Sequence, residues 1–499
     1  MISQSNFIKF NKCQKLFWLK NNMPRKTDEL PSIVQETIRN EKEVFELAKQ
    51  YFPDTFDCQI KKEDGQHNLA EQVELTKKAL AENHSALAKA SFIYENLSCT
   101  VDLLVKDEIG FSIYKVKAST KLKKSNLSTL EFAFQKYVLE KCGLKVNHIY
   151  IMNINKDYVF DSALDLNEFF KVECFDDNET INFHLEKIEK TINDINLMLG
   201  KEQEPETLFS GNCKFCEYND YCTKNIPSDN IESLYGIGTK AYSLYNQNIF
   251  TISDYIKSPE YEPSKNFRVD KQIELATQNI TEPYIDSEKL VEFLDKVKYP
   301  IYYLDFEMAN SVIPIFNGFK PFERYPFQYS LHTEYENGKI EHREFLGESI
   351  NCIRELAEQL VKDIPSGAQL VIYDASSEID CIKYLAEKFS DLSEHLLSLT
   401  NDYVDLLEPF KNVYYYNIKQ GGSNSIKHVM PALCPEMAND YNKLDEVHNG
   451  CDALTTFHTL IEKKGTDDYE KIRKAMLEYC KLDTLSMVKI LNKLKELVK

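Results

Sequence analysis

Five residues in the C-terminal half have the types and spacing of a metal-dependent catalytic site. Asp305 and Glu307 stand two apart in YYLDFEMA, so on a strand their side chains share one face. Two carboxylates on an apolar strand are costly to bury unless a cation neutralises them, and Mg²⁺ or Mn²⁺ prefers such hard oxygen ligands. Glu378 follows the apolar run QLVIYD, and Tyr479 and Asp483 lie four apart, on one face of a helix. Taken singly, each acid is explained as well by a solvated surface; together they predict a divalent-metal site.

Three cysteines form a second candidate site. Cys213, Cys216 and Cys222 lie in CKFCEYNDYC, with the close spacing of metal or cluster ligands. A tetrahedral centre needs four ligands, so the fourth has to come from elsewhere in the chain. Most of the other cysteines are scattered and are interpreted as core residues.

The elements predicted in the second half follow the order of a mixed α/β sheet. YPIYYLDFEMA predicts a strand, and FQYSLHTEYENGKIEHREFL predicts two more around the turn Asn337–Gly338. A helix, the buried strand QLVIYD, a second helix, an irregular region and a long final helix follow. This is the order of a ribonuclease H-like sheet, which we expect to bring the carboxylates together.

The first half alternates helices and strands. Periodicity predicts a helix ending at Pro53, strands on either side of a turn at Asp107–Gly110, then another helix and the strand VNHIYIMNIN. Residues 226–258 contain short helical patterns around Gly236-Ile237-Gly238 and resemble a helix-hairpin-helix module, whose turn offers N–H groups to a phosphate. An ordinary αα-hairpin is the equal alternative. The polar, proline-bearing stretch that follows predicts a linker over residues 259–290.

The composition limits the class of protein. The chain has 499 residues, 43% hydrophobic and 28% charged, typical of a globular protein of roughly two to four domains. With no signal-peptide core and no apolar run of membrane-spanning length, we expect a cytoplasmic protein without membrane association, whose cysteines are reduced or bind metal. The net charge of −19 argues against a surface coated for nucleic-acid binding, but it leaves room for a local basic groove.

The acids resemble the motifs of the DEDD group of 3′–5′ exonucleases, in which D-x-E, a second acid and Y-x-x-x-D follow in this order. By that resemblance four carboxylates hold two Mg²⁺ or Mn²⁺ ions ~4 Å apart: Asp305, Glu307, Glu378 and Asp483. Tyr479 would orient the attacking water. The second motif of the group is Asn-x-x-Phe-Asp, whereas residues 374–378 here are DASSE, so Asp374 is a second candidate ligand.

The cysteines resemble those of the iron–sulfur RecB-like exonucleases, including CRISPR-associated ones, where an N-terminal cysteine joins a C-x2-C-x5-C motif. The resemblance implies a [4Fe–4S] cluster with four ligands: Cys13, Cys213, Cys216 and Cys222. Zinc bound by the same thiolates is the alternative.

The same family places a PD-(D/E)xK nuclease core between those cysteines. Asp102, Lys117 and Gln135 fit its pattern, but Lys115 stands where a metal-binding glutamate belongs and Lys42 where a histidine belongs. A protonated lysine has no lone pair to donate and repels a divalent ion, so we predict a first domain that has lost nuclease activity.

The basic residues of this degenerate domain are interpreted as a nucleic-acid-binding platform. Six side chains are assigned to it: Lys115, Lys117, Lys121, Lys123, Lys124 and Gln135. A solvated charged strand and turn is the alternative. In the second half, Lys427 of GGSNSIKHVMP is a candidate contact for substrate phosphate, and a surface lysine on a helix is the equal alternative.

Nearly the whole chain resembles an uncharacterised bacterial family that joins a RecB-like iron–sulfur domain to a ribonuclease H-like domain, with shared blocks such as YYLDFE and EYCKLDTL. Four parts are expected: a RecB-like PD-(D/E)xK domain at 1–225, a helix-hairpin-helix-like region at 226–258, a linker at 259–290 and a DEDD exonuclease domain at 291–499.

The sequence therefore predicts a metal-dependent nuclease, a 3′–5′ exonuclease that hydrolyses phosphodiesters of DNA or RNA. The alternative is a non-catalytic nucleic-acid-binding or assembly factor in which both nuclease sites have decayed. A small-molecule phosphodiesterase on the same metal scaffold is the third possibility.

Overall fold

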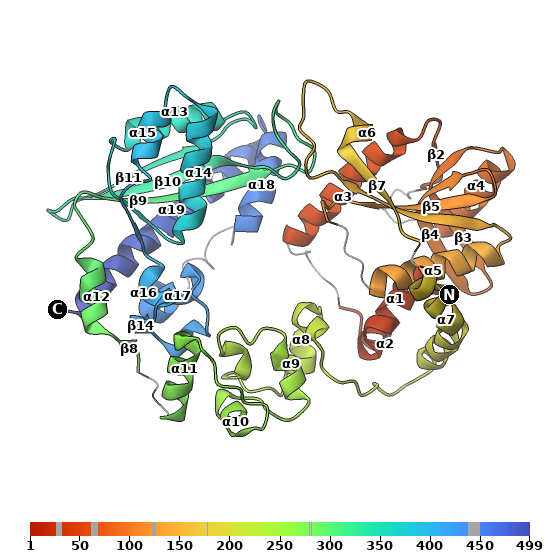
Figure 1. Cartoon of the computed structure of the whole chain (residues 1–499), viewed down its shortest axis with the longest axis horizontal. Helices are drawn as coiled ribbons and strands as arrows, with labels where there is room; N and C mark the ends of the chain where they lie inside the picture. The colour runs from red at the N-terminus through yellow and green to blue at the C-terminus, as the bar shows by residue number, and fades with distance from the viewer. Residues whose placement is uncertain are drawn as a thin grey trace. The chain divides into compact units, whose positions relative to one another are not determined.

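The chain folds into two compact units, each combining helices with a mixed sheet, in agreement with the predicted α/β class (Figure 1). The computed structural model describes residues 1–25, 32–60, 68–121, 126–176, 178–278, 280, 282–437 and 450–499. The first unit consists of residues 1–208 and 311–323, and the second of residues 209–310 and 324–499. The border predicted at residue 225 thus lies at residue 208, which places the cysteine trio in the second unit. None of the helices in the described stretches combines the length and apolar character that crossing a bilayer requires.

A seven-stranded mixed sheet forms the centre of the first unit, in the order β2-β3-β4-β5-β6-β7 with β1 beside β4. Its strands are β1 Ile2–Ser3, β2 Phe56–Asp57, β3 Ala86–Tyr94, β4 Leu97–Lys106, β5 Phe111–Lys117, β6 Val146–Ile154 and β7 Phe170–Cys174. Its helices are α1 Gln4–Lys12, α2 Gln14–Asn22, α3 Ser32–Tyr51, α4 Leu69–Ala81, α5 Asn126–Lys141, α6 Leu166–Phe169 and α7 Asn178–Leu199. The strands and helices predicted around Asp107–Gly110 and before Pro53 are confirmed. Phe134 of α5 and Phe7 of α1 pack in the core with ring centroids 4.6 Å apart.

The second unit begins with a group of short helices and one short strand. They are α8 Asn219–Thr223, α9 Lys240–Tyr245, α10 Ile252–Lys257, α11 Phe267–Thr277, β8 Tyr284–Ile285 and α12 Ser287–Leu294. Gly236 and Gly238 both have positive φ values, so a turn does separate the short helical segments there. The predicted linker over 259–290 is wrong, because α11 and α12 occupy it and bury Val269 and Leu290 in hydrophobic cores.

A five-stranded mixed sheet forms the centre of the second unit, in the order β11-β10-β9-β12-β13. Its strands are β9 Ile301–Asn310, β10 Arg324–Glu334, β11 Ile340–Leu346, β12 Leu370–Ile372 and β13 Tyr403–Asp405, and β14 Tyr415–Tyr416 pairs with β8. Its helices are α13 Ile353–Asp363, α14 Ala375–Lys388, α15 Ser393–Ser398, α16 Glu408–Lys411, α17 Ile426–Leu433, α18 Gly450–Glu462 and α19 Asp467–Leu497. β9 is antiparallel to β10 and parallel to β12.

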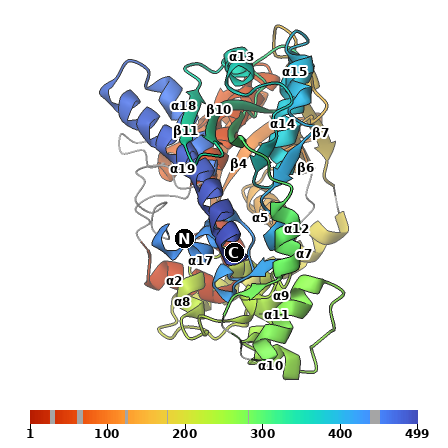
Figure 2. The same ribbon diagram turned by 90° about the vertical axis from the view of Figure 1, so that its left-hand side faces the viewer.

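Helices cover both faces of this sheet, with α13 and α14 on one side and α19 on the other (Figures 1 and 2). Neighbouring residues of a strand point to opposite faces, and β10 shows both. Tyr329 donates to Asp363 of α13 at 2.6 Å, and the side chain of Gln328 donates to the Met476 carbonyl of α19 at 2.9 Å. Asp305 and Glu307 lie on the α19 side, because Glu307 pairs with Gln328 in the register.

The short helices are joined tightly to the rest of the second unit. Gln272 of α11 donates to the Ser233 carbonyl at 2.8 Å and to the Tyr416 hydroxyl at 3.0 Å. Gly422, just before α17, comes so close that a Cβ on it would overlap the Ser233 carbonyl oxygen. A glycine is therefore required at this contact.

We expect Gly422→Ala to destabilise the second unit more than Gly421→Ala. Both glycines have left-handed φ values, +75° and +59°, where a Cβ costs roughly 1–2 kcal/mol, but only Gly422 also faces the Ser233 carbonyl. The midpoint of thermal unfolding, followed by far-UV circular dichroism, should fall further for Gly422→Ala. The fluorescence of Trp18, the single tryptophan and part of the first unit, should report an unchanged transition. Equal midpoints for the two variants would contradict the close contact.

Candidate functional site

The carboxylates of β9 face a helix that is fixed over them by polar contacts. Ser330, opposite Asp305 in the register, shares a hydrogen bond of 2.7 Å with the Thr484 hydroxyl of α19. Thr484 follows Asp483 directly, so this bond and that of Gln328 hold the acid-bearing part of α19 against the strand. The sequence pattern on β9 and the one on α19 thereby meet in space.

Four of the predicted metal ligands interact with one another. Burial and the neighbouring carboxylates of Asp483, Glu378 and Glu307 raise the pKa of Asp305 well above its ordinary value. Burial, Asp483 and Glu378 raise the pKa of Glu307 to about 8, although Lys427 opposes the shift. Glu307, Glu378 and Asp483 are each less than a tenth exposed. The arrangement concentrates negative charge where water cannot screen it.

Glu378 approaches this cluster from the first turn of α14. Burial, together with Asp374 and Asp405, raises the pKa of Glu378 to about 8. Its Oε2 is buried without a hydrogen-bond partner among the described residues. A buried carboxylate oxygen left without a donor is costly, and it is the ligand atom that a hard cation would take.

Tyr479 and Lys427 lie together beside the acids. The Lys427 ammonium donates to the Tyr479 hydroxyl at 3.1 Å and lies 5.2 Å from the centre of its ring. Tyr479 is 3% exposed. Lys427 lies in the first turn of α17. Its charge acts on Glu307, so it belongs to the site and not to a remote surface.

The donor set fits divalent metal ions. Ligand atoms of Asp305, Glu307 and Cys480 lie within 4.8 Å of one another. The Cys480 thiol donates to Asp305 at 3.9 Å. Burial raises the pKa of Cys480 well above its ordinary value, so this side chain is a neutral thiol beside the carboxylate oxygens. Carboxylate oxygens in such number suit Mg²⁺ or Mn²⁺ better than soft metals.

A model of a protein family, described as Domain of unknown function (DUF2779), matches residues 302–425. The match covers β9 to the start of α17 and includes Asp305, Glu307 and Glu378, but not Asp483. It agrees with the expectation of an uncharacterised family for this part of the chain. No curated protein matches the chain.

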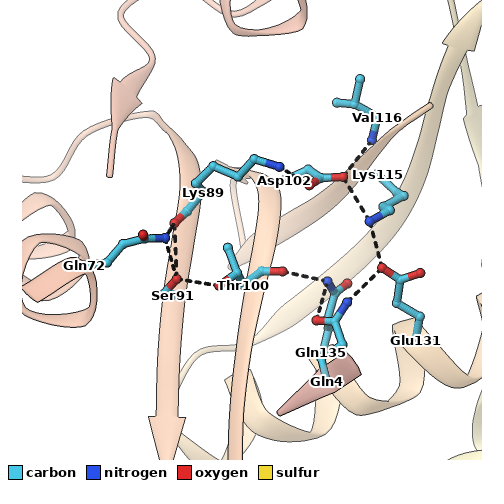
Figure 3. Close-up of polar contacts among 10 residues, drawn as sticks. All are labelled: Gln4, Gln72, Lys89, Ser91, Thr100, Asp102, Lys115, Val116, Glu131 and Gln135. Carbon is cyan, nitrogen blue, oxygen red and sulfur yellow. Dashed lines mark hydrogen bonds and ion pairs between the residues drawn. The ribbon is translucent and has the colours of Figure 1, made fainter. Parts of the chain in front are cut away.

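In the first unit, Asp102 lies in a polar network with Lys89 and Lys115 (Figure 3). Asp102 of β4 accepts from Lys89 at 2.7 Å and pairs with Lys115 at 3.2 Å, and Lys115 also pairs with Glu131 of α5 at 2.8 Å. Burial alone would raise the pKa of Asp102, but the ammonium groups of Lys115 and Lys89 hold it at about 2. Lys42 is exposed on α3.

Two residues of the predicted binding platform are engaged inside this network. Gln135 is 1% exposed, and its amide donates to Gln4 and to the Thr100 carbonyl, both at 3.1 Å. Lys115 is neutralised by two carboxylates. Neither arrangement favours a contact with nucleic acid.

Two other predicted platform lysines share a cavity with Lys115. Lys117 and Lys121 line this cavity of about 560 Å³ in the first unit, together with Lys115 and Glu131. Lys123 and Lys124 lie outside the described residues.

The predicted cluster ligands come from both units. Cys13 caps α2, where its sulfur accepts from the Leu16 N–H at 3.4 Å, and Cys213, Cys216 and Cys222 belong to the second unit. In the described parts of the chain, the cysteine trio is not among the groups with ligand atoms within 4.8 Å of one another. The [4Fe–4S] or zinc site stays a prediction.

Sequence reasoning missed several residues of these sites. Lys89 is the single charged residue of the apolar strand ALAKASFIY, which is the pattern that could have revealed it. Glu131 stands one helical turn before Gln135 on α5. Asp405 ends the short strand β13, and its carboxylate accepts from the Asp374 N–H at 3.0 Å.

We expect Lys115→Met to destabilise the first unit by roughly 3 kcal/mol, because it removes one of the two ion pairs of Asp102 and the ion pair of Glu131, and both carboxylates are half-buried. Adding Glu131→Gln should recover part of the loss. Lys117→Met, on the same strand, serves as the control. Denaturant unfolding followed through Trp18 fluorescence measures the change in this unit, and a loss no larger than that of Lys117→Met would contradict the network.

Proposed function

We propose that the second unit is a divalent-metal-dependent 3′–5′ exonuclease that hydrolyses phosphodiesters of DNA or RNA. The observation that carries the proposal is the grouping of four carboxylates from three elements, β9, α14 and α19. Three of them are buried and Asp305 is half-buried, and one oxygen of Glu378 has no hydrogen-bond partner among the described residues. A purely structural cluster of this kind would be expected to contain balancing cations. Among the described residues, Lys427 is a cation that lowers the pKa of Glu307, and the pKa is nevertheless raised to about 8.

The sheet supports a ribonuclease H-like fold for this unit. Three antiparallel strands, β9, β10 and β11, are followed by β12, which pairs with β9 in parallel. The acids lie on the first strand, after the fourth strand and on the last helix, which is the order of the DEDD exonucleases that the sequence resembles. Glu378 in place of their aspartate is longer by one methylene.

In the proposed mechanism Asp305, Glu307, Glu378 and Asp483 hold two metal ions. When bound, such ions activate a water and stabilise the leaving oxygen. Lys427 donates to the Tyr479 hydroxyl, which therefore acts as a donor toward its other neighbours and is suited to orient a water. The buried surroundings strengthen these interactions because bulk water is kept away.

The first unit is proposed to be a RecB-like domain that has lost its nuclease activity and serves as a binding platform. The ion pairs of Asp102 with Lys89 and Lys115 support the loss, since the carboxylate is already neutralised. The cavity with Lys117 and Lys121 is the part of this unit that suits a phosphate backbone. A [4Fe–4S] cluster with Cys13 and the cysteine trio belongs to this proposal.

We expect the purified full-length chain to shorten an end-labelled oligonucleotide from its 3′ end in Mg²⁺ or Mn²⁺. Asp305→Asn and Asp483→Asn should each lower the rate at least ~100-fold, because each removes a metal ligand. Asp391→Asn is the matched control, since Asp391 is an exposed acid paired with Arg354. Equal rates for Asp305→Asn and Asp391→Asn would rule out the carboxylate site, and a wild-type chain inactive on DNA and RNA would favour the non-catalytic factor.

In EDTA at pH 7 to 8, we expect Asp305→Asn to raise the midpoint of thermal unfolding. Its raised pKa means that folding disfavours the ionised form, so the group reduces stability at any pH above its unfolded value of about 4. Mn²⁺ should raise the midpoint of the wild type and leave that of Asp305→Asn nearly unchanged. A midpoint lowered by the substitution in EDTA would argue against repulsion among these acids.

A further inference from the structure

Arg268 of α11 carries a charge that no carboxylate among the described residues neutralises through an ion pair. It is 5% exposed, and its Nε has no hydrogen-bond partner in the described chain. Its Nη2 donates to the Lys411 carbonyl at 2.6 Å, and the Asn424 amide oxygen, turned toward the guanidinium, accepts from Nη1 at 2.8 Å. Both acceptors are neutral. Burying an unpaired charge is costly, so an arginine held in this way indicates a place for an anion.

Arg268 lines a cavity of about 620 Å³, a volume within the usual range for small-molecule sites. Tyr235 and Tyr373 also line it, and the Tyr235 ring lies 4.0 Å from the guanidinium carbon while remaining 40% exposed. Ser425 of the same wall is the N-cap of α17, and the N-terminus of a helix attracts negative charge. The cavity thus combines a cation, aromatic rings and a helix N-terminus.

The cavity adjoins the four carboxylates through Asp374. Asp374 lines the cavity and precedes α14, whose first turn carries Glu378. The charge of Asp374 acts on Glu378, which shows that the two lie close. If a linear polymer were bound in the cavity, the neighbouring linkage of its backbone would therefore lie near the carboxylates.

The wall that bears Arg268 and Tyr235 is held to the short strand β14 by hydrogen bonds. The Tyr235 N–H donates to Gln272 at 2.8 Å, and Gln272 in turn donates to Tyr416 of β14 at 3.0 Å. Gln272 is 2% exposed. A preformed wall of this kind keeps the ordering cost of binding small.

We propose that this cavity is a subsite for one nucleotide of the substrate strand, in which Arg268 pairs with a backbone phosphate and the exposed side of the Tyr235 ring stacks on the base. Arginine matches the geometry of phosphate oxygens, and base stacking on tyrosine tolerates any sequence. The proposal rests on the exonuclease function and adds to it the residues that hold the strand beside the carboxylates.

The test uses the full-length chain in EDTA and the fluorescence anisotropy of a 5′-fluorescein pentanucleotide, in a DNA and an RNA form. We expect Arg268→Gln to weaken binding at least ~10-fold, as the loss of a buried charge contact should. Arg268→Lys, which keeps the charge without the planar fork, should fall between Arg268→Gln and the wild type. Arg354→Gln is the matched control, because Arg354 is exposed and paired with Asp391.

Tyr235→Ala is a second test in case the Arg268 variants fail to fold, because the Tyr235 ring is partly exposed and its loss should leave the fold intact. This substitution should weaken binding by at least ~5-fold. Unchanged affinity in a folded Arg268→Gln and in Tyr235→Ala overturns the subsite, as does a wild type that binds neither pentanucleotide. These outcomes are separate from the fate of the exonuclease. Binding that depends on Arg268 without any cleavage would contradict the exonuclease proposal and support the subsite. Cleavage with an unchanged KM in Arg268→Gln would support the exonuclease proposal and contradict the subsite.

Discussion

Repulsion among four carboxylates that are buried or half-buried is the constraint on which the second unit depends. Asp305 lies on β9 and Asp483 on α19, the last helix of the chain, so the two residues are far apart in the sequence. The rest of the fold has to hold their carboxylates together against electrostatic repulsion. The C-terminal half of α19 supplies the means, because Ile490, Leu491 and Leu494 are completely buried in the core. Burial of these apolar side chains thereby keeps the part of α19 that carries Asp483 against the sheet. A bound cation would reduce this repulsion, so in the proposed enzyme the unit would be most stable with metal bound.

The first unit meets a similar constraint in the opposite way. Asp102 and Glu131 are also partly removed from water, but Lys115 pairs with both carboxylates and Lys89 pairs with Asp102, so the network contains its own cations. Both oxygens of Asp102 are engaged by these two lysines. In the second unit, burial and neighbouring carboxylates raise the pKa values of Asp305, Glu307 and Glu378, a shift that a bound cation would oppose. This difference is the physical reason to propose the chemistry for the second unit.

Local patterns made the acids and their elements predictable. The D-x-E pair sits on an apolar strand, and the Tyr479–Asp483 pair lies on a strongly periodic helix, so short windows of sequence suffice. α11 escaped prediction because its buried face carries Arg268 and Gln272, which give a linker-like composition. Lys89 was missed because its partner is set by the pairing of β3 with β4. Residues 311–323 follow β9 directly yet belong to the first unit, with Val312 in a core of that unit, and no local pattern encodes such a long-range choice.

The polar face of α11 also bears on how an acidic protein could hold a polyanion. With a net charge of −19, the chain repels nucleic acid at long range, and four of its acids stand where the scissile bond would lie. Salt screens exposed charges beyond about 8–10 Å, so attraction has to come from cations at contact distance. Arg268 and Lys427 fit that need in the second unit, one lining the neighbouring cavity and one acting on Glu307. In the proposed enzyme, the carboxylates would select the metal and the reaction, while a few enclosed cations beside them would determine which phosphates reach the site.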